Sequence, residues 1–528
     1  MHGKRASLIV NLRSGHTVLK VPEIVAVLNA AGWKTDVYLK EYSGETLQLA
    51  EQAARDGHDL VIGYGGDGTI NAVVNGVLYA GGKSIVGDIP GGTFNEWAGE
   101  TNIPRDPVKA ALALVDSVTC KIALGFFQVT DLAVPAHAMR HEQSESEENE
   151  EVEQAEQAGK RGETGETEEI HEKPKKAGKH RQYFLLHAGI GVDAAIMAHI
   201  NKPLKYEVGK IAFDLAGLKE LPRQHPFPVE ISSLNTSGKL DLLWKGQAWQ
   251  VIVNNSRLYA GTITLAPHAY IDDGILDVTV ITAGGPLATL EEAVSFLLLH
   301  TVDTTVTRNF RGPHLSISVP ASIELELDGS VVKLKDFLSK KERKAFEHAG
   351  DADKVMVHYC FDAVPTAVRM AFPSTYDGSM FEKPDHKKLF ERAAQQRKQR
   401  EEKLAVQQQE HQEVRQAGQV GQVGQSGQGF SKRVEELQQH GRKITVVGVA
   451  LNPHHPDTYI IAGTYRAMDD AQIEPAAVRI DEHTLVLNPR GGQVVPLMVE
   501  KLHEGEKITV EGKKSKRGVI DADCVMLS

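Results

Sequence analysis

The sequence predicts an α/β protein with an N-terminal parallel-sheet lobe, an antiparallel β lobe, a helical linker and a small C-terminal β domain. Three observations lead to this prediction. Short apolar runs alternate with helical patterns over residues 6–130, which favours a parallel sheet with helices on both faces. Residues 183–364 are rich in short strands punctuated by Gly, Asp and Pro, as in antiparallel sheets. A charged, Gln-rich stretch and a Gly-Gln repeat then precede a last globular segment.

The elements of the first lobe follow one another closely. Each strand is a short apolar run, each helix is a helical pattern between two such runs, and Gly32 ends the first helix. In chain order we expect the strand Leu8–Val10, the helix Pro22–Ala31, the strand Thr35–Tyr38, the helix Glu45–Asp56 and the strand Leu60–Ile62.

Composition excludes several classes of function. A net charge of -11 and a pI near 6.1 give no support for nucleic-acid binding. The three cysteines, Cys120, Cys360 and Cys524, are far apart, so we expect no disulfide framework and a reducing cytoplasm. Residues 1–7 do not resemble a signal peptide, and the most apolar later stretch, Ala293–Leu299, is too short to span a bilayer. Any membrane contact is therefore expected to be peripheral.

Changes of composition predict five segments. These are an α/β lobe at 1–136, an acidic disordered insertion at 137–182, a β-rich second lobe at 183–364, a charged helical and Gly/Gln-rich linker at 365–430, and a small β domain at 431–528. The insertion is expected inside a hairpin made by Ile122–Val129 and Tyr183–His187. Helices are expected at Tyr206–Leu221 and Leu287–His300, and a flexible linker at Gly418–Gly429.

The last segment resembles an OB-fold barrel, because its closing strands read Gly505–Gly512 and Val519–Met526. Five short strands are expected there: Ile444–Val449, Tyr459–Gly463, Leu485–Leu487, Ile508–Gly512 and Val519–Asp523. OB barrels bind many kinds of ligand or only support their neighbours, so this prediction does not assign a function.

The first motif with chemical content is Gly63–Thr69, which follows a strand and precedes the apolar helix Ile70–Leu78. Its glycines allow the backbone to turn sharply and approach a polyphosphate, and the helix N-terminus presents N–H groups to that anion. The carboxylate of Asp67 can coordinate Mg²⁺ or accept a proton. Considered alone, the motif also fits a tight turn with no ligand.

Two further turns have the same position relative to a strand. Ile89–Ala98 joins the strand Ser84–Val86 to a helix and carries the donors Thr93 and Asn95, and Asn11–Gly15 follows the first strand. Because the carboxyl ends of parallel strands share one edge of a sheet, all three turns are expected at the edge where open α/β sheets bind ligands.

The motifs Tyr64–Thr69 and Pro90–Asn95 together resemble the catalytic domain of the diacylglycerol kinase and sphingosine kinase superfamily. His187–Ala194, Asn254–Gly261 and Ala266–Asp277 are similar to the second lobe of its bacterial members. The resemblance covers residues 6–364 and does not extend to the last domain. It implies an ATP-dependent lipid kinase with a nucleotide lobe and an antiparallel β-sandwich lobe, which would meet a lipid alcohol such as diacylglycerol at a membrane surface. Self-association into a homo-oligomer stays open.

The resemblance also implies roles for single residues. Asp67 and Asp328 would be catalytic, and Asp273 with the carbonyl of Ile275 would help to hold Mg²⁺, although Asp272–Gly274 also fits an ordinary turn. The residues implied to bind ATP are Asn11, Arg13, Ser14, Gly15, Gly65, Gly66, Gly68, Thr69, Asn71, Gly92, Thr93 and Asn95.

Two departures from the family pattern leave alternatives open. Ser330 stands where the family commonly has the glutamate of Asp-Gly-Glu, and Ala72 stands where a glutamate is frequent. Because serine is a poor general base, a nucleotide- or lipid-binding regulator without catalysis is one alternative, and an NAD kinase-like enzyme is another. We expect residues 1–364 alone to carry the activity. We also expect Asp67→Asn to impair catalysis with little effect on stability.

Overall fold

The computed structural model of the chain describes residues 4–12, 17–134, 182–199, 225–235, 237–259, 263–282, 307–418, 426–452, 458–466, 473–488, 492–494, 496–515 and 518–527. It divides into two compact units. The first comprises residues 1–123, 270–273 and 365–528, and the second comprises residues 124–269 and 274–364. The helices predicted at 206–221 and 287–300 lie outside the described residues, as does the acidic stretch 135–181.

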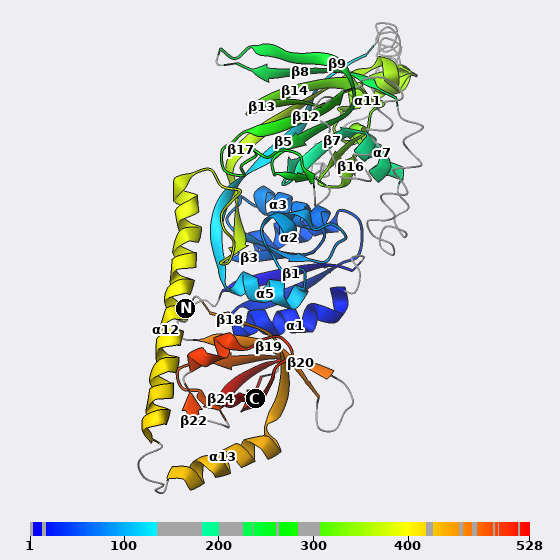
Figure 1. Cartoon of the computed structure of the whole chain (residues 1–528). Coiled ribbons are helices and arrows are strands. Elements are labelled where there is room, and N and C mark those ends of the chain that lie inside the picture. Colours follow the sequence, from blue (N-terminus) through cyan, green and yellow to red (C-terminus); the bar gives the residue numbers. More distant parts are fainter. Residues whose placement is uncertain are drawn as a thin grey trace, which may run out of the picture. The chain divides into compact units, whose positions relative to one another are not determined.

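The first unit contains the predicted parallel sheet (Figure 1). Strand β1 pairs in parallel with β2 and β3, and β3 pairs in parallel with β4. The strands are buried apolar runs except for β2 at the edge of the sheet, which is partly exposed. In chain order the elements are β1 Arg5–Asn11, α1 Thr17–Ala30, β2 Lys34–Lys40, α2 Glu45–Arg55, β3 Leu60–Gly65, α3 Asp67–Tyr79, β4 Ile85–Pro90, α4 Glu96–Glu100 and α5 Pro107–Val115.

Two long strands, β5 (Ser117–Ala133) and β17 (Met356–Pro373), contribute residues to both units. Strand β5 pairs antiparallel with β6 (Tyr183–Phe184), so the two sides of the acidic insertion form the expected hairpin. The last part of β17 pairs in parallel with β4, matching Arg369 with Ile85. Residues after 364 are therefore part of the first sheet and do not begin a linker.

An aromatic cluster follows the end of β17. The rings of Phe372, Tyr376, Phe381 and Phe390 lie 5.2–5.8 Å apart, and Trp97 of α4 contacts Phe372 at 5.8 Å. All five side chains are almost fully buried. The cluster holds the beginning of α12 (Pro384–Gly418) against the first sheet, and it buries a large apolar area.

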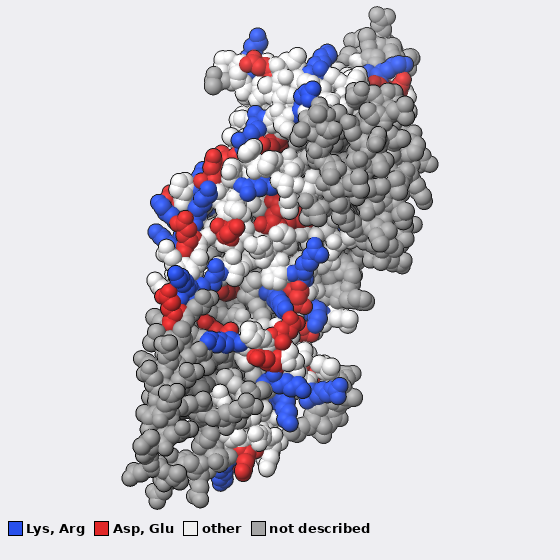
Figure 2. Space-filling view, viewed as in Figure 1, with Lys and Arg blue, Asp and Glu red and all other residues white. Residues whose placement is uncertain are grey.

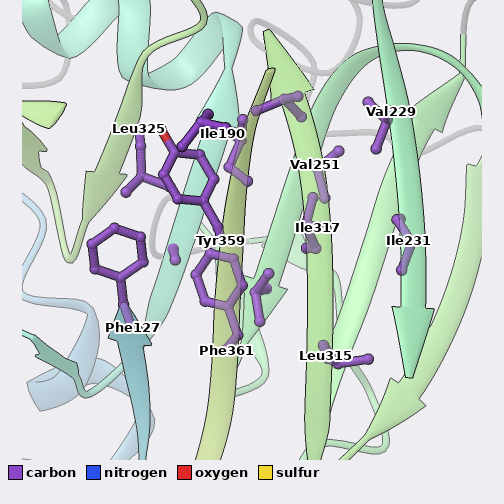
Figure 3. Close-up of a cluster of buried hydrophobic side chains, with 14 of the residues drawn as sticks. Phe127, Ile190, Val229, Ile231, Val251, Leu315, Ile317, Leu325, Tyr359 and Phe361 are labelled. Atoms are coloured by element: carbon purple, nitrogen blue, oxygen red, sulfur yellow. The ribbon is translucent and has the colours of Figure 1, made fainter. Parts of the chain in front are cut away.

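The second unit is antiparallel, as expected. Its strands are β7 His187–Gly191, β8 Phe227–Leu234, β9 Leu240–Asn254, β12 Leu276–Thr282, β13 Thr307–Gly312, β14 His314–Pro320, β15 Leu325–Leu327 and β16 Ser330–Val332. Within the described residues, these strands pair with one another in antiparallel fashion. Its core gathers aromatic and β-branched side chains from several strands, among them Phe127, Val251, Ile317, Tyr359 and Phe361 (Figure 3).

The C-terminal segment forms a closed barrel (Figure 1). Strands β18 (Arg442–Leu451), β19 (Tyr459–Arg466) and β20 (Ile473–Ile480) form a meander. Strand β20 pairs in parallel with β24 (Val519–Leu527), which pairs antiparallel with β23 (Lys507–Lys514), which returns to β18. This strand order, with the third strand parallel to the fifth, is that of an OB fold and agrees with the predicted class of the domain.

Two parts of this segment differ from the prediction. Strand β20 was not among the expected strands. It contains Pro475, and proline disfavours a central strand, yet β20 pairs with β19 along its whole length. Strand β21 (Leu485–Asn488), which was expected, pairs with β24 but lies outside the ring of five strands. Helix α13 (Ser426–His440) begins inside the stretch predicted as a Gly-Gln linker.

Charged side chains of both signs are interspersed over the described part of the face seen in Figure 2. The described atoms on that face show no continuous basic surface of the kind that nucleic-acid-binding proteins present. This agrees with the acidic net charge of the sequence.

Candidate functional site

The turn between β3 and α3 is rich in glycine because its atoms are packed too closely for side chains. A Cβ atom on Gly65 would lie 2.4 Å from Oγ1 of Thr69. The carbonyl of Gly66 accepts hydrogen bonds from the N–H groups of Thr69 and Ile70, at 2.7 and 3.2 Å, and so begins the helix. Helix α3 therefore starts directly at the turn, where its N–H groups and macrodipole favour an anion.

The turn after β4 contacts the turn after β3 through the backbone. The N–H of Gly91 donates to the carbonyl of Gly65 at 2.7 Å, and a Cβ on Gly92 would lie only 2.4 Å from Cα of Gly66. Asn95, with φ of 52°, closes its own turn, because its side chain accepts from Gly92 N–H and donates to Gly92 carbonyl, both at 2.8 Å. Side chains larger than hydrogen cannot fit where the two turns meet.

The end of β1 reaches the same place. The side-chain amide of Asn11, which is 8% exposed, donates to Oγ1 of Thr69 at 3.3 Å. The structure thus brings Asn11, Gly66, Thr69 and Gly92 together at the carboxyl edge of the sheet, as the sequence predicted. Residues 13–15, also predicted to bind ATP, lie outside the described residues.

The other predicted ATP contacts in these turns differ in exposure. Gly68 and Thr93 are partly exposed at the turns. Asn71 is fully buried, and its side-chain oxygen accepts a hydrogen bond from Nδ2 of Asn75 at 3.1 Å. Asn71 therefore stabilises the interior of α3, and its contact with ATP stays a prediction.

The carboxylate of Asp67 joins the two turns. Its Oδ1 accepts a hydrogen bond from the backbone N–H of Trp97 at 3.2 Å, at the start of α4. Burial raises the pKa of Asp67 above its usual range, and hydrogen bonds from backbone N–H groups oppose this shift. The carboxylate therefore also contacts protein and does not face only ligand. The expectation that Asp67→Asn hardly changes stability stays a prediction.

Asp88, in the middle of β4, is a second acidic group near Asp67 that sequence reasoning missed. It is 4% exposed and lies in register with Gly63 of β3. Burial raises the pKa of Asp88 well above its usual value, and the charge of Asp67 raises it further. The signal in the sequence was a carboxylate inside the apolar strand Ile85–Pro90. Ionisation of one of these two carboxyl groups therefore disfavours ionisation of the other.

Asp328, in the second unit, is held by the backbone. Its carboxylate accepts hydrogen bonds from the N–H groups of Leu185, Leu186 and His187 at 2.7, 2.9 and 3.0 Å. Its own N–H donates to the carbonyl of His187 at 3.1 Å, and its φ of 46° places it in the left-handed region. Asp328 thus fastens the β15–β16 turn to the residues entering β7, and its catalytic role stays a prediction.

Comparisons with known proteins agree with this geometry. Residues 5–127 match the diacylglycerol kinase catalytic domain, and residues 187–334 match the YegS C-terminal NAD kinase beta sandwich-like domain. A diacylglycerol kinase of Staphylococcus aureus (strain JH9) is 35% identical over 280 residues, which cover 53% of this chain and 70% of the relative. The chain belongs to the diacylglycerol kinase family. Another member, from Bacillus subtilis (strain 168), is 26% identical over 329 residues, or 62% of this chain and 89% of the relative.

A crystal structure of a diacylglycerol kinase from Bacillus anthracis (strain Sterne) is similar with a TM-score of 0.43 and 16% identity, covering 70% of this chain and 98% of that one. Both family matches end before residue 335. Within the described parts of the chain, we find no helix with the length and apolar character needed to cross a membrane.

The two carboxylates of the Asp-Asp-Gly turn differ in burial. Asp272, 3% exposed, accepts hydrogen bonds from the N–H groups of Glu382 and Lys383 at 2.7 and 3.0 Å and lies 2.8 Å from Nδ1 of His386. It therefore anchors the start of α12, which the sequence did not reveal. Asp273 next to it is partly buried, and its role as a Mg²⁺ ligand stays a prediction.

The donor set for Mg²⁺ is limited but chemically suitable. Among the residues that the structure describes, no cluster of three or more His, Cys, Asp or Glu side chains could hold a metal ion. Mg²⁺ commonly keeps several waters and takes only one or two carboxylates, so Asp273 with the Ile275 carbonyl fits its preferences. This assignment stays a prediction.

A buried polar cluster near the missing family glutamate was not predicted. Glu326 of β15, 2% exposed, accepts a hydrogen bond from the N–H of Gly329 and lies 3.4 Å from Nε2 of His187. Burial lowers the pKa of His187 to about 4. Glu326 thus places a carboxylate beside the turn where Ser330 replaces the usual glutamate.

The same cluster continues to α7 (Val192–His199). The ring of Tyr259 lies 5.1 Å from that of His187, and its hydroxyl donates to Asp193 at 3.2 Å. Burial raises the pKa of Asp193 to about 6, although hydrogen bonds from Tyr259 and the Ala194 N–H oppose this shift. Alternation along a strand could have suggested Glu326, because it is a charged residue between two apolar ones in Leu325–Leu327.

Proposed function

We propose that this chain transfers the γ-phosphoryl group of ATP to a hydroxyl of diacylglycerol or a related lipid alcohol, giving a phospholipid such as phosphatidic acid. The observation that supports this best is the backbone contact between the turns of Gly66 and Gly92. Phosphoryl transfer depends mainly on positioning and charge stabilisation, and two glycine turns at a helix N-terminus supply both for a polyphosphate.

Each group in the first unit has a defined task in this proposal. The N–H groups at the start of α3 bind the phosphates, and Asn11 orients Thr69 beside them. Asp67 keeps the second turn in contact with the first and carries the negative charge expected near the transferred group. Mg²⁺, when bound, would neutralise phosphate charge.

The family pattern does not identify the base that accepts the proton of the lipid hydroxyl in this chain, because Ser330 replaces the usual glutamate. Asp328 keeps the family position but already accepts three backbone hydrogen bonds. Glu326 is the nearest described alternative in the same hairpin. We propose that Asp67 and Asp328 are catalytic, and that Glu326→Gln tests whether the neighbouring carboxylate contributes.

A screen of lipid acceptors tests the function directly. Purified full-length protein is incubated with labelled ATP, Mg²⁺ and mixed micelles that contain diacylglycerol, a sphingoid base or a monoacylglycerol, and the labelled lipid is separated from ATP. We expect a labelled phospholipid from one class of acceptor. The proposed lipid acceptor requires contact with a membrane surface, so pelleting with vesicles that contain the best acceptor is the matching test of peripheral membrane association.

A regulator without catalysis is the second candidate, and Ser330 and Ala72 favour it. It predicts binding of ATP or lipid with no labelled product under any condition. NAD in place of lipid in the same assay tests the NAD kinase-like alternative, for which a labelled dinucleotide would be the positive result.

A further inference from the structure

The C-terminal barrel lies outside both family matches and has no role in the proposed reaction. OB folds bind their ligands on the face of the second and third strands and with the loops between strands one and two and between strands four and five. In this barrel the corresponding parts are β19 and β20, the loop after Leu451 and the loop after Lys514.

The outer face of these strands is buried although it points away from the barrel core. The barrel interior contains Ile461, Val478 and Ile480, so their neighbours on the same strands point outward. Three of these outward neighbours, Ile460, Ala462 and Ala477, are 0%, 2% and 0% exposed. Another part of the first unit must therefore cover this face.

Helix α1 covers it, as the contacts at both loops show (Figure 1). A Cβ on Gly518, in the loop between β23 and β24, would lie 3.4 Å from Cβ of Ala26. At the other loop, Nδ2 of Asn452 donates to the carbonyl of Ala31 at 3.4 Å. Helix α1 thus touches the two loops and the strand face that OB folds use for ligands.

Arg479 of β20 holds the end of this helix. Its Nε donates to the carbonyl of Ala30 at 2.9 Å, and its Nη2 donates to the carbonyl of Asn29 at 3.3 Å. The last carbonyls of a helix have no partner within the helix, and a cation there also interacts favourably with the helix dipole. Arg479 also pairs with Asp521 within the barrel at 2.9 Å.

The second contact of the barrel lies on α5. A Cβ on Gly448 of β18 would lie 2.9 Å from Cδ1 of Leu112, so this strand approaches the helix closely. Lys109 of α5 forms an ion pair with Glu504 at 2.6 Å. The barrel therefore contacts both α1 and α5, which pack against each other.

We propose that helix α1 of this same chain is the ligand of the barrel, and that the barrel acts as a clamp that positions α1 for nucleotide binding. Helix α1 contacts β1, and Asn11 at the end of β1 donates a hydrogen bond to Thr69 in the candidate site, so a shift of α1 would reach this edge of the sheet through β1. In this arrangement Arg479 is a positioning residue. The ATP part of the proposal rests on the proposed function, whereas the occupation of the OB face does not.

The test compares full-length variants by hydrogen exchange and by nucleotide affinity. Arg479→Ala removes the contact with α1, and Asp521→Ala removes only the partner of Arg479 inside the barrel. Arg466→Ala, on the exposed end of β19, is the matched surface control. Because hydrogen bonds from a charged donor are worth about 1.5–3 kcal/mol, Arg479→Ala should speed exchange at the end of α1 by at least about tenfold.

Nucleotide affinity is measured by calorimetry with ADP, which needs no turnover. We expect Arg479→Ala to weaken ADP binding severalfold, Arg479→Lys to recover part of the affinity, and both control variants to behave like the wild type. A labelled oligo-dT, followed by fluorescence anisotropy, is expected not to bind the wild type because its face is covered.

Three results would overturn the proposal. The first is a rate of hydrogen exchange at the end of α1 that is the same in Arg479→Ala and in Asp521→Ala. The second is binding of oligo-dT to the wild type while the amides of α1 stay protected from exchange. The third is an opened α1 with unchanged ADP affinity. If the wild type binds no nucleotide at all, the proposed kinase function fails instead, and the exchange data still decide whether α1 occupies the face.

Discussion

Replacing Gly92 by alanine tests the central contact of the candidate site. The added Cβ would lie 2.4 Å from Cα of Gly66, 2.9 Å from Oδ1 of Asn95 and 3.0 Å from the nitrogen of Gly66. Two of these neighbours are backbone atoms in a turn that follows a buried strand, so they cannot rotate away as a side-chain end would. The two turns must separate.

The size of the separation follows from ordinary contact distances. Van der Waals contact begins at 3.4 Å, so the turns must move apart by about 1 Å. A misplacement of about 1 Å in a site that acts by positioning can cost a factor of about a hundred in rate. We therefore expect Gly92→Ala to lower kcat/KM for ATP about a hundredfold. Gly66→Ala, whose Cβ would lie 3.2 Å from Gly92, should have a smaller effect.

The assay is an ATP titration at saturating lipid, together with thermal melting of each variant. Gly99→Ala is the matched control, since a Cβ there meets no atom within 4 Å and Gly99 lies in the adjacent helix α4. Equal kcat/KM values for Gly92→Ala and Gly99→Ala would refute the reasoning. A Gly92→Ala protein that is unfolded at the assay temperature would shift the test to Gly66→Ala.

Other predictions concern catalysis, pH dependence and domain limits. Asp67→Asn should lower kcat at least about a hundredfold with little change in the melting temperature, because the side-chain oxygen of asparagine can still accept a hydrogen bond from the Trp97 N–H; a clearly lower melting temperature would contradict this second part. Ser330→Glu should raise kcat if the missing family glutamate limits the rate, and unchanged turnover would show that it does not. Burial raises the pKa of Asp193 to about 6, so its protonated form stabilises the fold below about pH 4, and this contribution is lost as pH rises through 6. Asp193→Asn should therefore flatten the change in melting temperature between these values, which a pH series of melting curves measures. A chain that ends at residue 364 should fail to form the first unit by circular dichroism, since it lacks the strand that pairs with β4; a folded, active fragment would contradict the structure and restore the earlier expectation.

The sequence alone was sufficient for the parallel sheet, the three turns at its edge and the membership in a kinase family. These features are local, because a strand, a glycine turn and a helix start are encoded within about ten adjacent residues. Asn11, Gly66, Thr69 and Gly92 come together for a topological reason, since consecutive parallel strands end at one edge. That part of the site could be predicted without coordinates.

Side-chain roles in the site could not be predicted in this way. Asp67, Asp272 and Asp328 all looked like free carboxylates in polar turns, yet each accepts hydrogen bonds from backbone N–H groups elsewhere in the chain. For Asp272 and Asp328 those groups are more than a hundred positions away. Acidic residues in such turns look alike in a sequence whether they face a ligand or hold a distant backbone segment, because only the folded chain brings their partners near.

The limits of the first unit also depended on tertiary structure, because strands from distant parts of the sequence pair in its sheet. Strand β17 passes the position where composition suggested a boundary, and its pairing with β4 joins residues that are nearly three hundred positions apart. Strand β20, which the sequence analysis did not predict, is paired on both sides in the closed barrel. The sequence determined which segments could be strands, helices or phosphate-binding turns. Only the folded chain decided that Arg479 would bind the end of α1. This contact joins residues 449 positions apart, and it depends on how the barrel packs against the helix.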